Sequence, residues 1–223
     1  MWLNYSNNPT GATADLGFFA RAVAFARRYD LLLCHDAPYS DVTYDGYVAP
    51  SMLQVDGASE IAVEFNSFSK TYNMPGWRMG MVVGNADALA SLDRVESNMG
   101  SGIFRPLQEA AVQALSVAPE WLAARNEVYR ERLEIVQVGL NAAGIETSRP
   151  RATLYAWARI PSGWVSSEEF ALALLEQAGV SVAPGSFFGP AGEGYVRISV
   201  TAPTERVREA IERFSQFASS LAA

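Results

Sequence analysis

Apolar and polar positions along residues 1–118 predict strands that alternate with helices. Residues 1–5 form a short apolar strand, and the Asn-Asn-Pro-Thr-Gly stretch at 7–11 is a dense turn signal. Thr13 or Asp15 then caps a helix that runs to Tyr29. Further strands are predicted over 31–35, 60–66 and 79–84, and further helices over 86–98 and 105–117. The apolar strand at 31–35 is typical of a buried parallel sheet.

The pattern changes at Pro119, which suits the first turn of a long helix over 120–143 that Gly144 ends. After it come a strand at 153–160, a helix at 167–177, short strands near Val180 and at 195–200, and a last helix from Thr204. This order is that of an α+β unit. The sequence therefore predicts an α/β domain over residues 1–118 and a smaller α+β domain over 119–223 that includes the long linking helix.

Composition and charge narrow the class of protein. Of 223 residues, 49% are hydrophobic and 18% are charged, so the chain buries a core and is neither disordered nor fibrous. The net charge of −7, with no basic run, argues against nucleic acid as the main partner. No apolar stretch is long enough to cross a bilayer, and residues 1–6 do not resemble a signal peptide. The single cysteine permits no internal disulfide, and we expect a soluble cytoplasmic protein.

One residue count points to chemistry. Of the 17 basic residues, Lys70 is the single lysine and the other sixteen are arginines. A preference for arginine codons explains the sixteen but not the one. Arginine replaces lysine where only charge is needed, but it does not form a Schiff base. The surroundings of Lys70 must therefore decide between chance and function.

Three polar clusters follow predicted strands. The first is Ser67-Phe68-Ser69-Lys70 with Arg78 eight residues later, the second is Asp36-Ala37-Pro38-Tyr39, and the third is the turn at 7–11. Taken singly, each has a structural explanation as a solvated loop, a cap or a turn. Ligands bind at the carboxyl ends of strands in open α/β sheets, so the three together indicate a convergent site. A pyridine cofactor needs such a set, because a lysine bonds its aldehyde, an acid pairs with its ring nitrogen, and donors hold its phenolic oxygen and phosphate.

Four motifs carry a family resemblance. They are NNPTG at 7–11, HDAPYSDVTYDGY at 35–47, EFNSFSKTYNMPGWRMG at 64–80 and YVRIS at 195–199. In this order they resemble the class I and II aminotransferases, pyridoxal-phosphate enzymes of fold type I, and most closely the LL-diaminopimelate and aspartate types. The resemblance implies an α/β large domain with a mostly parallel sheet and an α+β small domain. It also implies transfer of an amino group between an amino acid and a 2-oxo acid.

The resemblance implies roles for residues around the cofactor. Lys70 resembles the lysine that forms the internal aldimine and then shuttles a proton. Asp36 resembles the acid that pairs with the pyridine nitrogen, which makes the ring a better electron sink. Asn8 and Tyr39 resemble the donors to the phenolate oxygen.

Other roles concern the phosphate and the substrate. Ser67, Ser69 and Arg78 resemble ligands of the cofactor phosphate. Arg197 resembles the arginine that binds the substrate α-carboxylate, with Asn8 beside it, a bidentate task that suits a planar guanidinium. The family is also expected to act as a homodimer.

The chain departs from the family pattern at its start. NNPTG lies well inside the large domain of the family, but here it begins at residue 7, and Ser6 stands where proline is usual. The resemblance therefore predicts that the aromatic residue stacked on the pyridine ring and the helix-start amides for the phosphate are missing. We expect weak cofactor binding, a tendency to associate and impaired activity.

Two other functions stay open on the sequence alone. A lyase or decarboxylase uses the same lysine and acid on the same fold, and a shortened chain could be a non-catalytic remnant. A metal site is not expected, because Cys34, His35 and Asp36 are strand neighbours whose side chains alternate between faces.

Overall fold

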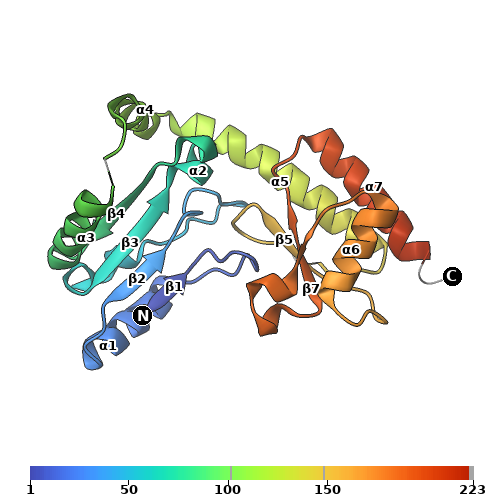
Figure 1. The fold of residues 1–223 in the computed structure, drawn as a ribbon, viewed down its shortest axis with the longest axis horizontal. Coiled ribbons are helices and arrows are strands. Elements are labelled where there is room, and N and C mark those ends of the chain that lie inside the picture. The colour runs from blue at the N-terminus through green and yellow to red at the C-terminus, as the bar shows by residue number, and fades with distance from the viewer. Residues whose placement is uncertain (101, 148, 221–223) are drawn as a thin grey trace. The chain divides into compact units, whose positions relative to one another are not determined.

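The computed structural model describes residues 1–100, 102–147 and 149–220, and these form two compact units (Figure 1). Unit 1 comprises Met1–Asn7 and Ala12–Ala124, and unit 2 comprises Asn8–Gly11 and the chain from Arg125 onward. The division falls inside the long helix α5 (Pro119–Ala142), some residues after the boundary inferred from sequence. The turn at 8–11 belongs to unit 2 although its neighbours in the chain belong to unit 1.

Unit 1 is built on a four-stranded sheet with the order β1-β2-β3-β4. The strands are β1 (Trp2–Asn4), β2 (Leu33–Asp36), β3 (Ala62–Ser67) and β4 (Gly80–Gly84). The first three are parallel, and β4 runs antiparallel to β3. The expected α/β fold with a mostly parallel sheet is thus confirmed. Because β1, β2 and β3 are parallel, their carboxyl ends lie at one edge of the sheet.

Helix α1 (Leu16–Arg28) covers one face of this sheet. Its N-cap is Asp15, whose Oδ1 accepts a 2.6 Å hydrogen bond from the Phe18 amide, so the second of the two expected caps is used. Phe19, Ala22, Val23 and Ala26 pack against Leu33 and the strand residues around it. Strand β2 begins two residues later than expected because the Leu31 amide still bonds to the Ala26 carbonyl.

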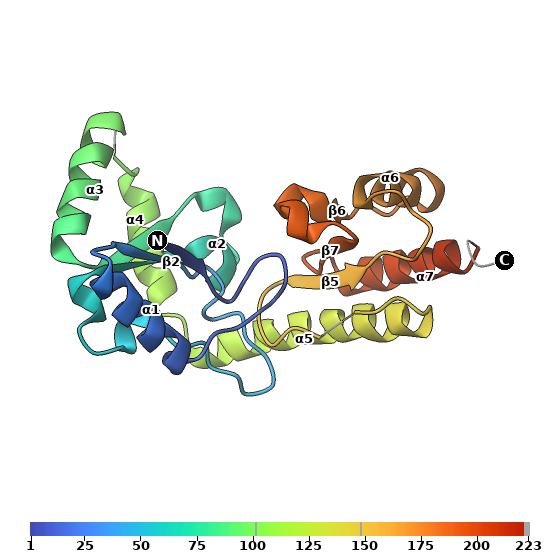
Figure 2. The same cartoon turned by 90° about the horizontal axis from the view of Figure 1, so that it is seen from below.

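Three further α-helices complete unit 1, namely α2 (Phe68–Thr71), α3 (Ala86–Met99) and α4 (Arg105–Leu115). Figure 2 shows α1 and α3 on opposite sides of the sheet. Phe68 of α2 and Ala111 and Ala114 of α4 form one buried cluster with Met79, which precedes β4. None of the described helices is long and apolar enough to cross a membrane.

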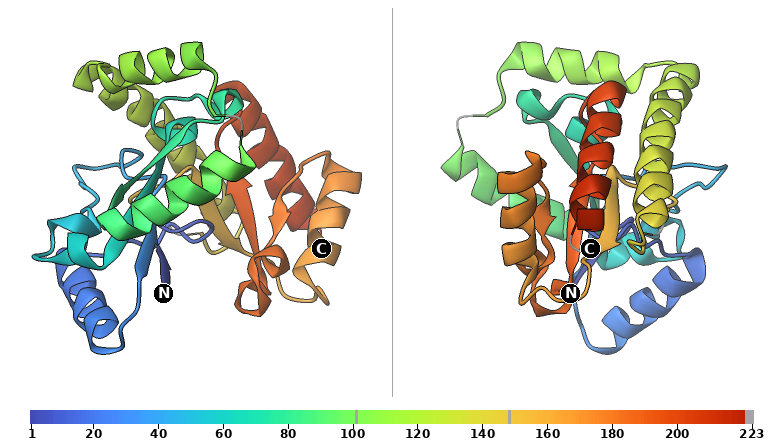
Figure 3. Two further views of the ribbon diagram at one scale, coloured as in Figure 1. Left: turned by 60° about the vertical axis from the view of Figure 1, so that its left-hand side comes forward. Right: turned by 90° about the vertical axis from the view of Figure 1, so that its right-hand side faces the viewer.

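Unit 2 contains a three-stranded antiparallel sheet with the order β5-β7-β6 and three helices around it (Figure 3). Its elements besides α5 are β5 (Tyr155–Arg159), α6 (Ser167–Ala178), β6 (Ala183–Pro184), β7 (Tyr195–Ser199) and α7 (Thr204–Ser220). Phe170, Leu174 and Phe214 are fully buried at its centre. The strand expected near Val180 lies at Ala183 instead, because the Val180 amide closes α6 by bonding to the Leu174 carbonyl.

Candidate functional site

The carboxyl edge of the unit 1 sheet carries most of the residues expected at the site. Strand β2 ends at Asp36, and β3 ends at Ser67, which leads directly into α2 with Ser69 and Lys70. Arg78 precedes β4, whose first residue, Gly80, pairs with Ser67. The fold of unit 1 therefore brings two of the three predicted polar clusters, 36–39 and 67–70 with Arg78, to one edge of the sheet, whereas the turn at 8–11 belongs to unit 2.

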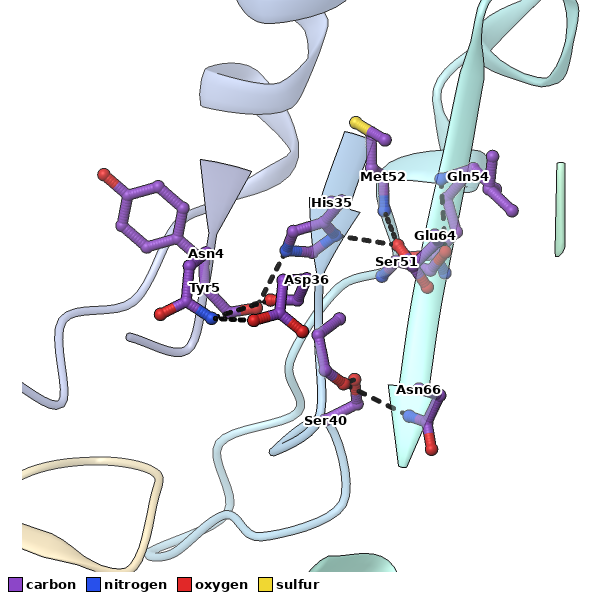
Figure 4. Close-up of polar contacts among 12 residues, drawn as sticks. Asn4, Tyr5, His35, Asp36, Ser40, Ser51, Met52, Gln54, Glu64 and Asn66 are labelled. Atoms are coloured by element: carbon purple, nitrogen blue, oxygen red, sulfur yellow. Dashed lines mark hydrogen bonds and ion pairs between the residues drawn. The ribbon is translucent and has the colours of Figure 1, made fainter. Parts of the chain in front are cut away.

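Asp36 is held by Asn4, a residue that the sequence analysis missed. The two are register partners on β1 and β2, and Asn4 Nδ2 donates to the Asp36 carbonyl at 2.8 Å and to Asp36 Oδ2 at 3.3 Å (Figure 4). Asn4 is oriented in turn by Asn7, whose Nδ2 donates to Asn4 Oδ1 at 3.0 Å. Strand register decides this contact, so only the pairing of β1 with β2 could have predicted it.

The environment of the Asp36 carboxyl shifts its acidity. The side chain lies at an exposed strand end, but the protein atoms around the carboxyl remove part of its hydration. This desolvation raises the pKa of Asp36 above its ordinary value, and the neighbouring His35 offsets part of the rise. A cationic group placed against the Asp36 carboxylate would therefore stabilise its ionised form.

The turn after β2 is fixed to β3. The Ala37 amide donates to the Phe65 carbonyl at 2.9 Å, and the Ala37 carbonyl accepts from Ser40 Oγ at 2.8 Å and from Asn66 Nδ2 at 3.2 Å. Tyr39, within this turn, is buried with 3% of its surface exposed. The turn is thus a rigid platform next to Asp36, and Asn66 is a second supporting residue that sequence reasoning did not find.

The residues expected to bind a phosphate lie at two places, at the start of α2 and just before β4. Ser67 caps α2, and its Oγ accepts from the Ser69 amide at 3.3 Å. Lys70, in the same short helix, is half-buried. Arg78 has a left-handed backbone with a φ of 54°, and its exposed guanidinium donates to the Pro75 carbonyl at 3.1 Å. Ser69 and Lys70 lie in this four-residue helix and Ser67 caps it, and the pairing of β4 with β3 brings in Arg78.

Unit 2 holds the other two expected residues, and it brings them into contact. Arg197 Nη1 donates to Asn8 Oδ1 at 2.8 Å. The Arg197 guanidinium carbon lies 4.2 Å from the ring centre of Tyr155 and 4.7 Å from that of Phe188. Two rings at these distances stabilise the cation and restrict its rotation. Neither ring was singled out from the sequence, because β5 and the segment before β7 meet Arg197 only in the folded sheet.

One nitrogen of Arg197 is unpartnered among the described residues. Its Nε is buried and has no hydrogen-bond partner among the described residues. A buried donor without a partner costs free energy, about 1–3 kcal/mol. A carboxylate that accepted from Nε and the adjacent guanidinium nitrogen would remove this cost in a bidentate pair. The arrangement suits an anionic group with two oxygens.

Comparisons with known proteins place these features in context. The profile described as aminotransferase class I and II matches residues 1–214. The LL-diaminopimelate aminotransferase of Moorella thermoacetica is 52% identical over 213 residues, which are 96% of this chain and 54% of that protein. The LL-diaminopimelate aminotransferase of Gloeobacter violaceus is 50% identical over the same length and covers the same shares. The chain thus spans about half the length of the curated relatives it matches.

Solved structures agree in fold. BacF from Bacillus subtilis superimposes with a TM-score of 0.93 at 38% identity and covers 98% of this chain and 56% of its own. A probable N-succinyldiaminopimelate aminotransferase from Thermus thermophilus has a TM-score of 0.90 at 43% identity, covering 96% of this chain and 57% of that one. The fold, the order of the four motifs and the profile match agree, and the chain belongs to the class I and II aminotransferases.

Proposed function

We propose that this chain takes part in pyridoxal-phosphate-dependent transfer of an amino group between an amino acid and a 2-oxo acid. In this proposal unit 1 binds the cofactor and unit 2 binds the substrate carboxylate. The proposal also includes a homodimer and a cytoplasmic location, which the family resemblance implies. It rests on family membership and on the chemistry of the residues in each unit.

The observation that carries the proposal is the position of the single lysine. Lys70 follows β3 at the carboxyl edge of the sheet, where Asp36 ends the neighbouring strand. A pyridoxal cofactor requires a primary amine for its aldehyde and an acid for its ring nitrogen. Sixteen other basic residues are arginines, which cannot supply that amine.

The donor set of unit 1 fits the cofactor chemically. When bound, pyridoxal phosphate supplies an electron sink for the carbanion at the substrate Cα. Asp36 would hold a proton on the pyridine nitrogen, with Asn4 orienting its carboxylate. Ser67, Ser69 and Arg78 would bind the phosphate, and the Lys70 amine would move the proton at the substrate Cα.

Unit 2 would bind the substrate through Arg197. Asn8 and two aromatic rings hold the guanidinium in one orientation before any ligand arrives. Preorganisation of this kind lowers the entropic cost of binding a carboxylate. Nε, buried without a described partner, supplies one of the two donors.

Relatives suggest a substrate. Eight curated relatives that are 43–52% identical over most of this chain are named LL-diaminopimelate aminotransferases. Structures named aspartate or aromatic aminotransferases share 28–31% identity. We therefore propose LL-diaminopimelate as the amino acid to test first.

The test follows the cofactor to its attachment site. The chain is incubated with pyridoxal phosphate and reduced with borohydride, and its peptides are analysed by mass spectrometry. We expect one stable adduct on the peptide that contains Lys70 and none in Lys70→Arg. Transfer from LL-diaminopimelate to 2-oxoglutarate is then measured. An adduct on the amino terminus alone would contradict the assignment of Lys70, and keto-acid-independent product would favour a lyase.

A further inference from the structure

The single histidine of the chain is buried beside the proposed site. His35 belongs to β2, directly precedes Asp36, and has only 1% of its surface exposed. Its Nδ1 lies 2.9 Å from Glu64 Oε2 on β3, and its Nε2 lies 2.8 Å from the Tyr5 carbonyl, next to the end of β1 (Figure 4). His35 therefore links β2 both to the middle of β3 and to the residue that follows β1.

The partners of His35 determine its protonation. A backbone carbonyl only accepts hydrogen bonds, so Nε2 carries a proton. Glu64 Oε2 also accepts from the Met52 amide at 2.9 Å, which is the environment of an ionised carboxylate. Burial raises the pKa of Glu64, but hydrogen bonds from His35, Met52 and Ser51 outweigh it and leave the pKa below its ordinary value. An ionised Glu64 only accepts, so the 2.9 Å contact between Glu64 Oε2 and Nδ1 calls for a proton on Nδ1 as well.

Among the described residues packed around His35, Glu64 is the charged side chain bonded to it. Strand β1 presents the Tyr5 carbonyl, α1 presents the apolar ring of Phe19 at 4.8 Å, and β3 presents Glu64. The 3-10 turn at Met52–Gln54 adds a backbone amide, which bonds to Glu64 rather than to His35. Glu64 is thus the acidic side chain bonded to His35, and Asp36 is the next residue along β2.

Side chains alternate along β2, so His35 and Asp36 point to opposite faces of the sheet. Leu33 and His35 face α1, where Leu33 joins the apolar core. Asp36 lies on the other face with Asn4, its register partner. On the α1 face, the contact between His35 and Glu64 fixes the backbone next to Asp36. On the other face, Asn4 holds the Asp36 carboxylate.

We propose that His35, held as an imidazolium by Glu64, is a positioning residue for the site. It ties β2 to β1 and to β3 next to Asp36, and its charge favours the ionised form of the Asp36 carboxylate. The importance of Asp36 rests on the proposed aminotransferase function, whereas the ion pair and its effect on Asp36 do not.

Nuclear magnetic resonance tests the ion pair without any cofactor. Because His35 is the sole histidine, labelling histidine with ¹⁵N gives the two ring nitrogens of one residue. We expect both to carry protons at pH 7, and only one to do so in Glu64→Gln. Glu60→Gln, which breaks the exposed Arg27–Glu60 pair, is the matched control and should leave both protons in place. A single protonated nitrogen in the unaltered chain would overturn the proposal.

A second measurement reads Asp36 itself. The ¹³C carboxyl resonance of Asp36, assigned by its absence in Asp36→Asn, is followed with pH. In His35→Gln we expect its titration midpoint to rise by about one pH unit, while exposed Asp87 is unchanged. Glu64→Gln keeps the shape of the side chain and should raise the midpoint in the same direction, which guards against misfolding of His35→Gln. An unchanged midpoint in both variants would refute the proposal.

A third measurement separates this inference from the proposed function. Binding of pyridoxal phosphate is followed by its absorbance at pH 7. We expect His35→Gln and Glu64→Gln to bind about tenfold more weakly than the unaltered chain and Glu60→Gln to bind equally well. Equal binding by all variants would contradict the positioning role. If the unaltered chain binds no cofactor, the proposed function fails, and the two resonance measurements still decide whether His35 is charged and acts on Asp36.

Discussion

Asn8 Oδ1 accepts a 2.8 Å hydrogen bond from Nη1 of Arg197, a residue 189 positions further along the chain. This bond joins the turn at 8–11 to the central strand β7 of unit 2. It uses one guanidinium nitrogen and leaves Nε for another acceptor. The turn motif and the arginine motif, which are separate in the sequence, are therefore bonded to each other within unit 2.

Replacing Asn8 with alanine should weaken substrate binding more than it slows the chemical step. Loss of a hydrogen bond to a charged group costs about 1.5–3 kcal/mol, and part of that falls on the orientation of Arg197. We expect KM for the amino acid to rise about tenfold. The control is Asn98→Ala on α3, because the side-chain Nδ2 of Asn98 donates to the Arg94 carbonyl of the same helix. Steady-state kinetics of both variants measure the change in KM and kcat. A lower kcat with an unchanged KM would contradict the role.

Lysine should not replace Arg197. A lysine keeps the charge but has neither the planar fork for a carboxylate nor the flat surface that contacts the rings of Tyr155 and Phe188. We expect kcat/KM to fall tenfold or more, by about 1.5–3 kcal/mol, while the absorbance of the bound cofactor is unchanged. Arg159→Lys on β5 serves as control because that side chain is 61% exposed. A parallel loss in the control would show that the effect is not specific.

Asp36→Asn should separate cofactor binding from catalysis. The amide keeps the shape of the carboxylate and its contact with Asn4, but it no longer stabilises a protonated ring nitrogen. We expect the rate of single-turnover transamination to fall at least a hundredfold, within the range of acid–base contributions. Cofactor binding, measured by absorbance, should change much less. Equal losses of binding and rate would argue against this division.

The stability of unit 1 should depend on pH through Glu64. Its folded-state pKa lies below the ordinary value of 4.5, so its stabilising contribution is present above that value and is lost as pH falls through the folded pKa. At pH 7 we expect Glu64→Gln to lower the free energy of unfolding by about 1–3 kcal/mol, less than for a fully buried pair because His35 can lose its proton.

The difference in Tm between Glu64→Gln and the unaltered chain should shrink as pH is lowered from 7 towards 3. Thermal unfolding followed by circular dichroism measures it. Glu60→Gln should change Tm little at any of these values, because its pair with Arg27 is exposed. A difference that is constant with pH would mean that Glu64 acts through packing and not through charge.

Gly11 should be needed for the placement of the turn that carries Asn8. Its φ is +72°, and a Cβ there would lie 2.5 Å from Pro150 Cβ. Gly46 has nearly the same backbone, with a φ of +74°, but nothing lies within 4 Å of its Cβ position. Gly46→Ala should cost about 1 kcal/mol from backbone strain alone. Gly11→Ala should cost about 1–3 kcal/mol more and raise KM, which thermal melts and kinetics of the two variants test.

The sequence by itself determined the family, the fold class and the local chemistry. The apolar periodicities located the elements, Asp15 was among the expected caps, and the single lysine is the amine that the proposed function assigns to a pyridoxal cofactor. These features are local in the chain or carried by motifs, so they can be read without knowing which segments meet. The starts of β2 and β6 were predicted less accurately. Leu31 and Val180 suit a strand, but their amides form the hydrogen bonds that close the preceding helices.

Only the tertiary structure decided which side chains support the site. Asn4 reaches Asp36 through the register of β1 with β2, His35 reaches Glu64 through that of β2 with β3, and Tyr155 and Phe188 meet Arg197 in unit 2. A carboxylate in the middle of the apolar strand at 62–67 is a sign of a buried partner, but it does not identify that partner. Strand register depends on the packing of whole faces, since a shift of one residue would turn every side chain to the other side of the sheet.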